Sequence, residues 1–121
     1  MKFRQVVLES GAKIILGKDA KSNEELVKEF KGKKNTILHT AMPGSPFCVI
    51  EVKKSDKADV RAAAVYCARY SQDWRDNKGD VKVNVFTGKD VYKSKGMPTG
   101  TFGVKKSRTI AVKKEEIQKF K

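Results

Sequence analysis

The sequence predicts one α+β domain over residues 1–121, with two main helices and a mixed or mainly antiparallel sheet. Two observations lead to this fold class. Short apolar runs bounded by turn residues recur along the whole chain, whereas only two stretches have the three-four spacing of an amphipathic helix. The predicted order is β-β-α-β-β-α followed by about four strands. The length of 121 residues suits a single domain, and 39% apolar residues suffice for one core.

The first half of the chain begins with a predicted hairpin. Residues 3–8 and 12–16 are apolar strands, and Glu9-Ser10-Gly11 between them is a turn signal. A first helix follows, for which Ser22 and Glu25 form a capping-box pattern at the N-terminus. Its apolar face comprises Leu26, Val27 and Phe30, and Gly32 is a candidate left-handed C-cap.

The middle of the chain predicts two strands and the second helix. Residues 36–40 form a short strand, and residues 47–52 are apolar at nearly every position, which is typical of a central strand. Asp56 or Asp59 caps the helix. Its core-facing stripe extends to the only tryptophan and comprises Val60, Ala63, Ala64, Cys67, Ser71 and Trp74.

The last third predicts strands with irregular connections. Valines alternate with other residues over 81–86, and residues 90–93 form a short strand. Residues 94–100 contain two glycines and a proline and form a loop. Strands at 101–104 and 109–112 flank a basic hairpin tip at 105–108, and a last helical turn covers 115–120.

Composition restricts the function classes. No apolar run approaches the roughly 20 residues of a membrane-spanning helix, and the N-terminus lacks a secretory signal, so a cytoplasmic protein is expected. Cys48 and Cys67 have no zinc-site spacing and are expected to be reduced and buried, with no metal and no cofactor. Gly17-Lys18-Asp19 lacks the spacing of a nucleotide-hydrolysing loop. His39 has no nucleophile or carboxylate nearby in sequence, so the protein is not expected to be an enzyme.

The positive charge is concentrated in the last third. The chain carries 27 basic and 14 acidic residues, and residues 78–114 alone hold 10 basic and 2 acidic ones. Such a surface favours a polyanion as partner, and the excess of lysine over arginine favours phosphate contacts over base reading. We predict that the binding cations lie around loop 94–100 and tip 105–108, namely Lys89, Lys93, Lys95, Lys105, Lys106 and Arg108.

Two further features have two interpretations each. Pro43-Gly44-Ser45 either cradles an anion with backbone amides or simply links two strands, and the strand-linking turn is favoured. Phe86 and Phe102 lie in strands beside lysines, where they either stack on bases or pack on the sheet, and packing is the commoner role. Trp74 is expected in the core because it continues the apolar stripe.

Four segments, in order, resemble the NFACT-R domain family, and the ordered match extends over nearly the whole chain, from about residue 12 to residue 113. The segments are Leu16-Gly17-Lys18-Asp19 with Asn23-Glu24-Glu25-Leu26, then Leu38-His39 with Pro43-Gly44-Ser45, then Ala62 to Ser71, then Val91 to Gly100. The last has the family pattern V-x-K-x-K-G-x-x-x-G. The chain departs from the family's D-x-W-x-H at Asn35 and Ile37, and from its P-G-S-H at Pro46.

The resemblance implies a stand-alone, non-catalytic RNA-binding domain. It is related to the C-terminal part of fibronectin-binding-protein-A-like and nuclear-export-mediator-factor-like proteins of ribosome quality control. The implied partners are tRNA or ribosomal RNA and the large ribosomal subunit, and Lys18 and His39 join the lysines above as candidate contacts. A protein-interaction module docking on a ribosome-associated partner, or a general DNA binder, remains an alternative.

Overall fold

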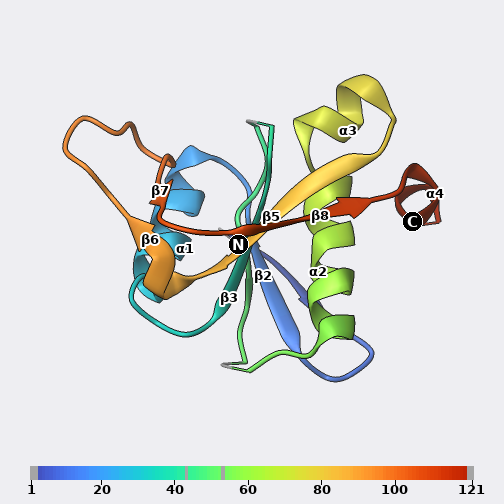
Figure 1. The fold of residues 1–121 in the computed structure, drawn as a ribbon, viewed down its shortest axis with the longest axis horizontal. Coiled ribbons are helices and arrows are strands. Elements are labelled where there is room, and N and C mark those ends of the chain that lie inside the picture. Colours follow the sequence, from blue (N-terminus) through green and yellow to red (C-terminus); the bar gives the residue numbers. More distant parts are fainter. Residues whose placement is uncertain (1–2, 43, 53, 120–121) are drawn as a thin grey trace.

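A computed structural model of the chain describes residues 3–42, 44–52 and 54–119. One antiparallel sheet has the strand order β1-β2-β4-β3-β5-β8 (Figure 1). Its strands are β1 Phe3–Val7, β2 Lys13–Gly17, β3 Thr36–Thr40, β4 Cys48–Ile50, β5 Val81–Thr87 and β8 Arg108–Val112. A separate antiparallel ribbon pairs β6 Val91–Tyr92 with β7 Gly103–Val104. The predicted α+β class, with an antiparallel sheet, is confirmed.

Helices cover both faces of the sheet. In Figure 1, α1 and the β6–β7 ribbon lie on one side of the sheet, and α2, α3 and α4 lie on the other. The helices are α1 Ala20–Phe30, α2 Lys57–Arg69, α3 Gln72–Asn77 and α4 Lys114–Gln118, and a 3₁₀ turn η1 covers Gly88–Asp90. Among the described residues, no helix has the length and apolar character needed to cross a bilayer.

The two faces of the sheet hold two separate cores because side chains alternate along each strand. Residues facing α1 include Ile15, Ile37 and Phe86, which pack with Leu26 and Val27. Residues facing α2 pack with its small side chains and with Trp74; the strand members are Ile14, Leu16, Leu38, Cys48, Ile50, Val81, Val83, Val85 and Val112. Every residue of β4 is therefore buried, as predicted for a central strand.

Both cysteines carry free thiols in the buried interior. Burial raises the pKa of Cys67 to about 12 and that of Cys48 well above its ordinary value. The expected reduced and buried state of the thiols agrees with these positions.

The first helix begins earlier than predicted. The N-cap is Asp19 rather than Ser22: the Asp19 carboxylate accepts from the Ser22 N–H at 2.8 Å, and the Ser22 hydroxyl oxygen accepts from the Asp19 N–H at 3.0 Å. Ser22 thus fills the position that glutamate usually holds in a capping box. At the other end Lys31 is the C-cap, and Gly32 follows it with φ +85°.

Gly17 allows α1 to approach the end of β2. A Cβ atom at Gly17 would collide with the side chain of Asn23. Asn23 in turn accepts a hydrogen bond from the Phe47 N–H at 3.1 Å, and the Gly17 N–H donates to the Phe47 carbonyl at 3.1 Å. One buried amide therefore ties the start of α1 to the segment that leads into β4.

The second predicted helix is two helices. Asp56 is the N-cap of α2, which ends at Arg69. Ser71 breaks the helix because its hydroxyl donates to the Ala68 carbonyl at 2.6 Å and accepts from the Trp74 N–H at 3.1 Å, so it caps α3 instead. Trp74 is 6% exposed, and its predicted place in the core is confirmed.

The basic hairpin predicted at 105–108 is wrong. Strand β7 pairs with β6, whereas β8 pairs with β5, so residues 105–107 form a crossover from the ribbon to the sheet edge. The β8 register places Ile110 opposite Val83 and Val112 opposite Val81, which adds apolar side chains to the α2 core. The predicted last helix corresponds to α4, and Phe120 lies outside the described residues.

Candidate nucleic-acid interface

A cleft of about 690 Å³ lies where β2 and β3 end and the chain turns towards β4. Three motifs noted in the sequence meet there: the Gly17–Asp19 turn, His39, and the Gly44-Ser45 pair. Residues 99–102, at the end of the predicted irregular loop, form another wall. Pro43 of the Pro43-Gly44-Ser45 motif lies outside the described residues. The topology thus brings sequence-distant polar turns to one end of the sheet.

The floor of the cleft combines aromatic and amide side chains. The His39 ring stacks on Phe47 with centroids 4.2 Å apart, and Phe102 meets Phe47 edge-on at 5.8 Å. Asn84 of β5 is the register partner of His39 and also lines the cleft. The Thr109 hydroxyl donates to the Asn84 Oδ1 at 2.9 Å, which turns the amide nitrogen of Asn84 away from β8.

His39 is held neutral by its surroundings. Burial lowers the pKa of His39, and hydrogen bonds with the Thr40 and Ser45 backbone only partly oppose this effect. The Ser45 hydroxyl is engaged as well, because it accepts from the Thr40 N–H at 3.1 Å. The arrangement suits a flat, uncharged ring that forms part of a binding surface.

Cations stand at the rim of the cleft. Lys18 is exposed there, and Arg4 and Arg75 also line the cleft. The Arg4 guanidinium lies 4.1 Å from the centroid of the Tyr70 ring, a cation–π geometry. Sequence reasoning did not find either arginine, because they come from β1 and α3, and only the folded topology places them beside Lys18.

A second hollow of about 350 Å³ adjoins the cleft, with Phe86 and Ser107 lining both. Lys106 and Arg108 line this hollow together with Asp90 and the hydroxyl-bearing Thr36 and Thr87. Phe86 itself is 5% exposed and packs in the α1 core, so the commoner of its two predicted roles holds. We call the two hollows, which share Phe86 and Ser107 as lining residues, together with the crossover of residues 105–107, the basic track.

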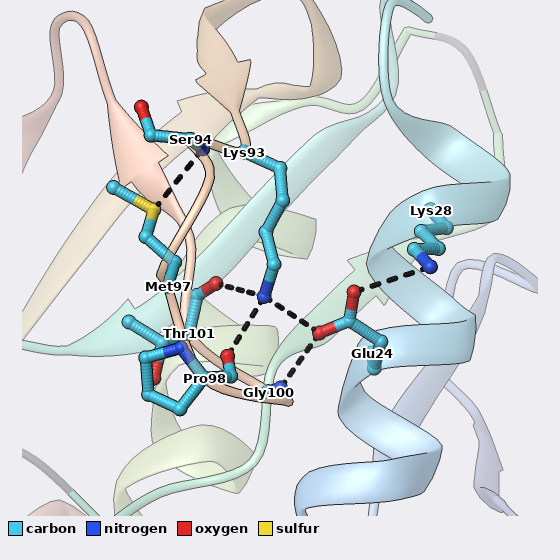
Figure 2. Close-up of polar contacts among 8 residues, drawn as sticks. All are labelled: Glu24, Lys28, Lys93, Ser94, Met97, Pro98, Gly100 and Thr101. Carbon is cyan, nitrogen blue, oxygen red and sulfur yellow. Dashed lines mark hydrogen bonds and ion pairs between the residues drawn. The ribbon is translucent and has the colours of Figure 1, made fainter.

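Lys93 has a different environment from the other predicted cations (Figure 2). Its ammonium donates to the Glu24 carboxylate at 2.9 Å and to the carbonyls of Pro98 and Thr101 at 2.7 Å each. The Gly100 N–H donates to the same Glu24 oxygen at 2.7 Å. Lys93 therefore fastens the loop between β6 and β7 onto α1, and its ammonium is engaged by these three oxygens.

Glu24 is the fixed partner in this clamp. Burial would raise the pKa of Glu24, but the hydrogen bonds from the Gly100 N–H and the Lys93 ammonium outweigh that effect and lower it below its ordinary value. Lys28, one turn along α1, adds an ion pair at 3.4 Å. The carboxylate is thus charged at neutral pH, and the loop carrying the exposed Lys95 has a defined anchor.

The remaining predicted cations divide into two groups. Lys105 is exposed in the crossover, where its backbone N–H donates to the Asp90 carbonyl at 2.8 Å. Lys89 is exposed in η1 and lines neither hollow. The structure thus brings Lys18, Lys105, Lys106 and Arg108 to the track, whereas Lys89 lies apart from it.

An α+β domain with this cleft and basic track matches a known family. The family model of the NFACT protein RNA binding domain matches residues 2–106, and the chain belongs to this family. The resemblance inferred from the four sequence segments is confirmed.

The chain is also similar to a curated protein and to a solved structure. It is 32% identical over 76 residues to the archaeal Rqc2 homolog aRqcH of Methanocaldococcus jannaschii, a match covering 61% of this chain and 11% of that protein. The solved C-terminal part of the fibronectin/fibrinogen-binding protein from Streptococcus suis matches 98% of this chain and 49% of that structure, with a TM-score of 0.83 and 20% identity. The second likeness concerns the fold. The chain spans only a part of each relative.

Proposed function

We propose that this domain binds RNA through the basic track, by charge and shape and without catalysis. The observation that carries the proposal is that the His39 cleft adjoins the hollow lined by Lys106 and Arg108, with Phe86 and Ser107 lining both. Membership of the NFACT RNA-binding family supports the ligand class. The similarity to an Rqc2 homolog supports a role in ribosome-associated quality control, with tRNA or ribosomal RNA as the ligand.

The charge of the track is available to a ligand. Within the described ranges, the ion pairs engage other cations, and the side chains of Lys105, Lys106 and Arg108 have no carboxylate partner. The net charge of +13 adds a long-range attraction for any polyanion. Lysine ammonium groups on an exposed crossover suit phosphate oxygens, which fix position without reading sequence.

A salt titration with matched variants tests the proposal. Lys105, Lys106 and Arg108 are changed together to alanine, and the control changes the exposed Lys54, Lys57 and Lys114, which lie at or near α2 and α4. Removing one phosphate contact reduces the slope of log affinity against log salt by roughly 0.7–0.9. We expect the slope for RNA to fall by about 2 in the track variant and to stay near the wild-type value in the control.

Three outcomes would contradict the proposal. Equal slopes for the two variants would mean that the track is not the RNA surface. RNA affinity that is weak and independent of salt would favour docking on a protein partner instead. Equal affinity for DNA and RNA of one sequence would indicate a general nucleic-acid binder, because phosphate contacts alone do not distinguish the two polymers.

A further inference from the structure

We propose that the cleft holds one unpaired nucleobase of the bound RNA, with Asn84 as the hydrogen-bonding residue; this inference rests on the function proposed above. Asn84 lies on the cleft floor opposite His39 in the strand register. The inference makes the ligand an unpaired RNA segment and assigns it a base-contacting residue, whereas the cations of the track account only for phosphate contacts.

The side-chain amide of Asn84 is oriented by a hydrogen bond to its oxygen, and its N–H donors are available to a ligand. Its oxygen is occupied by the Thr109 hydroxyl at 2.9 Å. Within the described part of the chain, its amide nitrogen has no hydrogen-bond partner, and the residue is half-buried. A side-chain amide offers two N–H donors, which match the ring nitrogen and carbonyl acceptors on a base edge.

The walls of the cleft fit a flat heterocycle. The Phe102 ring forms one wall and His39, stacked on Phe47, lies in the floor. Bases stack favourably on aromatic side chains, and the neutral state of His39 keeps this surface compatible with an uncharged ring. The hydroxyls of Thr99, Thr101 and Ser107 at the margin can bind sugar or phosphate oxygens.

The shape of the cleft argues against a paired segment. A volume of about 690 Å³ lies in the range of pockets that enclose a small molecule. The bases of an intact RNA duplex are stacked inside the helix, and its deep major groove does not admit side chains. In the wide minor groove a duplex presents only the edges of its stacked bases, whereas an unpaired or extruded base can place its whole ring against Phe102 and His39 and its edge at Asn84.

The test uses the full chain and three probes at several salt concentrations: a labelled single-stranded RNA of mixed sequence, the same strand annealed to its complement, and the four nucleoside 5′-monophosphates. The variant is Asn84→Ala, and the control is Gln118→Ala, an exposed amide on α4 at the other face. We expect Asn84→Ala to weaken single-strand binding about five- to tenfold, as for the removal of one base contact. Its salt slope should equal that of the wild type, because the variant keeps every phosphate contact.

Three results would contradict the proposed base site. The first is that Asn84→Ala and Gln118→Ala bind the single strand with the same affinity. The second is a reduced salt slope for Asn84→Ala, and the third is that Asn84→Ala weakens duplex binding as much as single-strand binding. Monophosphates that bind as tightly as the single strand would make a free nucleotide the ligand. If Asn84→Ala does not fold, Asn84→Leu, which keeps the volume without the donors, gives the same comparison. A wild-type chain with no salt-dependent RNA binding would refute the proposed function itself, whereas salt-dependent binding that is indifferent to Asn84 refutes the subsite alone.

Discussion

Replacing Lys93 with methionine should release the loop between β6 and β7 from α1 while leaving the sheet folded. Methionine keeps much of the chain length but removes the ammonium, which has three oxygen partners. The contacts with the two carbonyls are exposed, so water can replace them. The contact with Glu24 is partly buried, with the two side chains 22% and 13% exposed, and its removal dominates the cost.

The expected cost of Lys93→Met is about 2 kcal/mol in the free energy that docks the loop. A hydrogen bond to a charged group contributes about 1.5–3 kcal/mol, and the residual exposure of the pair places this contact in the lower half of that range. In Lys93→Met, the Glu24 carboxylate still has the Gly100 N–H and the Lys28 ammonium as partners, so no unpaired buried charge is left. The global stability should fall by less, because the loop can detach without unfolding the sheet.

Amide hydrogen exchange is the direct measurement of this effect. A decrease of about 2 kcal/mol corresponds to exchange roughly 30-fold faster at the Gly100 N–H, which the docked loop protects. Lys95→Met is the matched control, since Lys95 is exposed two residues along in the same loop. If the Gly100 N–H exchanged at the same rate in both variants, the contacts of Lys93 would not stabilise the docked loop. Lys93 would then again be a candidate RNA contact.

Two other predictions concern stability. Gly17→Ala should lower the free energy of unfolding, measured in urea, by about 2 kcal/mol, because the added methyl group has no room beside α1. The control Gly79→Ala, with nothing within 4 Å of the added atom, should change the free energy of unfolding by less than about 1 kcal/mol. Equal effects of the two substitutions would contradict the packing argument. The lowered pKa of Glu24 means that its contribution is complete above its unfolded value of 4.5 and is lost as the pH falls through the folded value. Wild type should therefore lose more stability than Glu24→Gln between about pH 5 and pH 3, and parallel pH profiles would contradict the clamp.

The elements that could be predicted from sequence are those with a strong local pattern. The alternating valines of β5 and the apolar run containing β4 determine both the element type and the degree of burial. The strands with which β7 and β8 pair could not be predicted in the same way. A short basic segment between two apolar runs suits a tight hairpin and a crossover equally well, and the choice depends on which distant strand buries more apolar surface.

The candidate site could be predicted only in part. Lys18 and His39, two of the candidates from sequence, line the cleft, because a glycine turn and a polar residue at a strand end are visible in sequence. Lys93 and Lys95 look alike in sequence, yet one is bound and the other exposed. The difference comes from Glu24, which lies 69 positions away from Lys93 in the chain. Asn84 likewise owes its orientation to Thr109 across the sheet edge.

The chain leaves the sheet after β5 and returns to the adjacent edge position as β8. Everything between, from η1 through the β6–β7 ribbon to Ser107, is an excursion whose two ends are held by one strand pair. Changes of length or composition within the excursion need not disturb the register of Val81 with Val112. Homologues can therefore diversify the segment that lines the cleft while the sheet stays constant, so that changes at this surface are separated from changes of the fold.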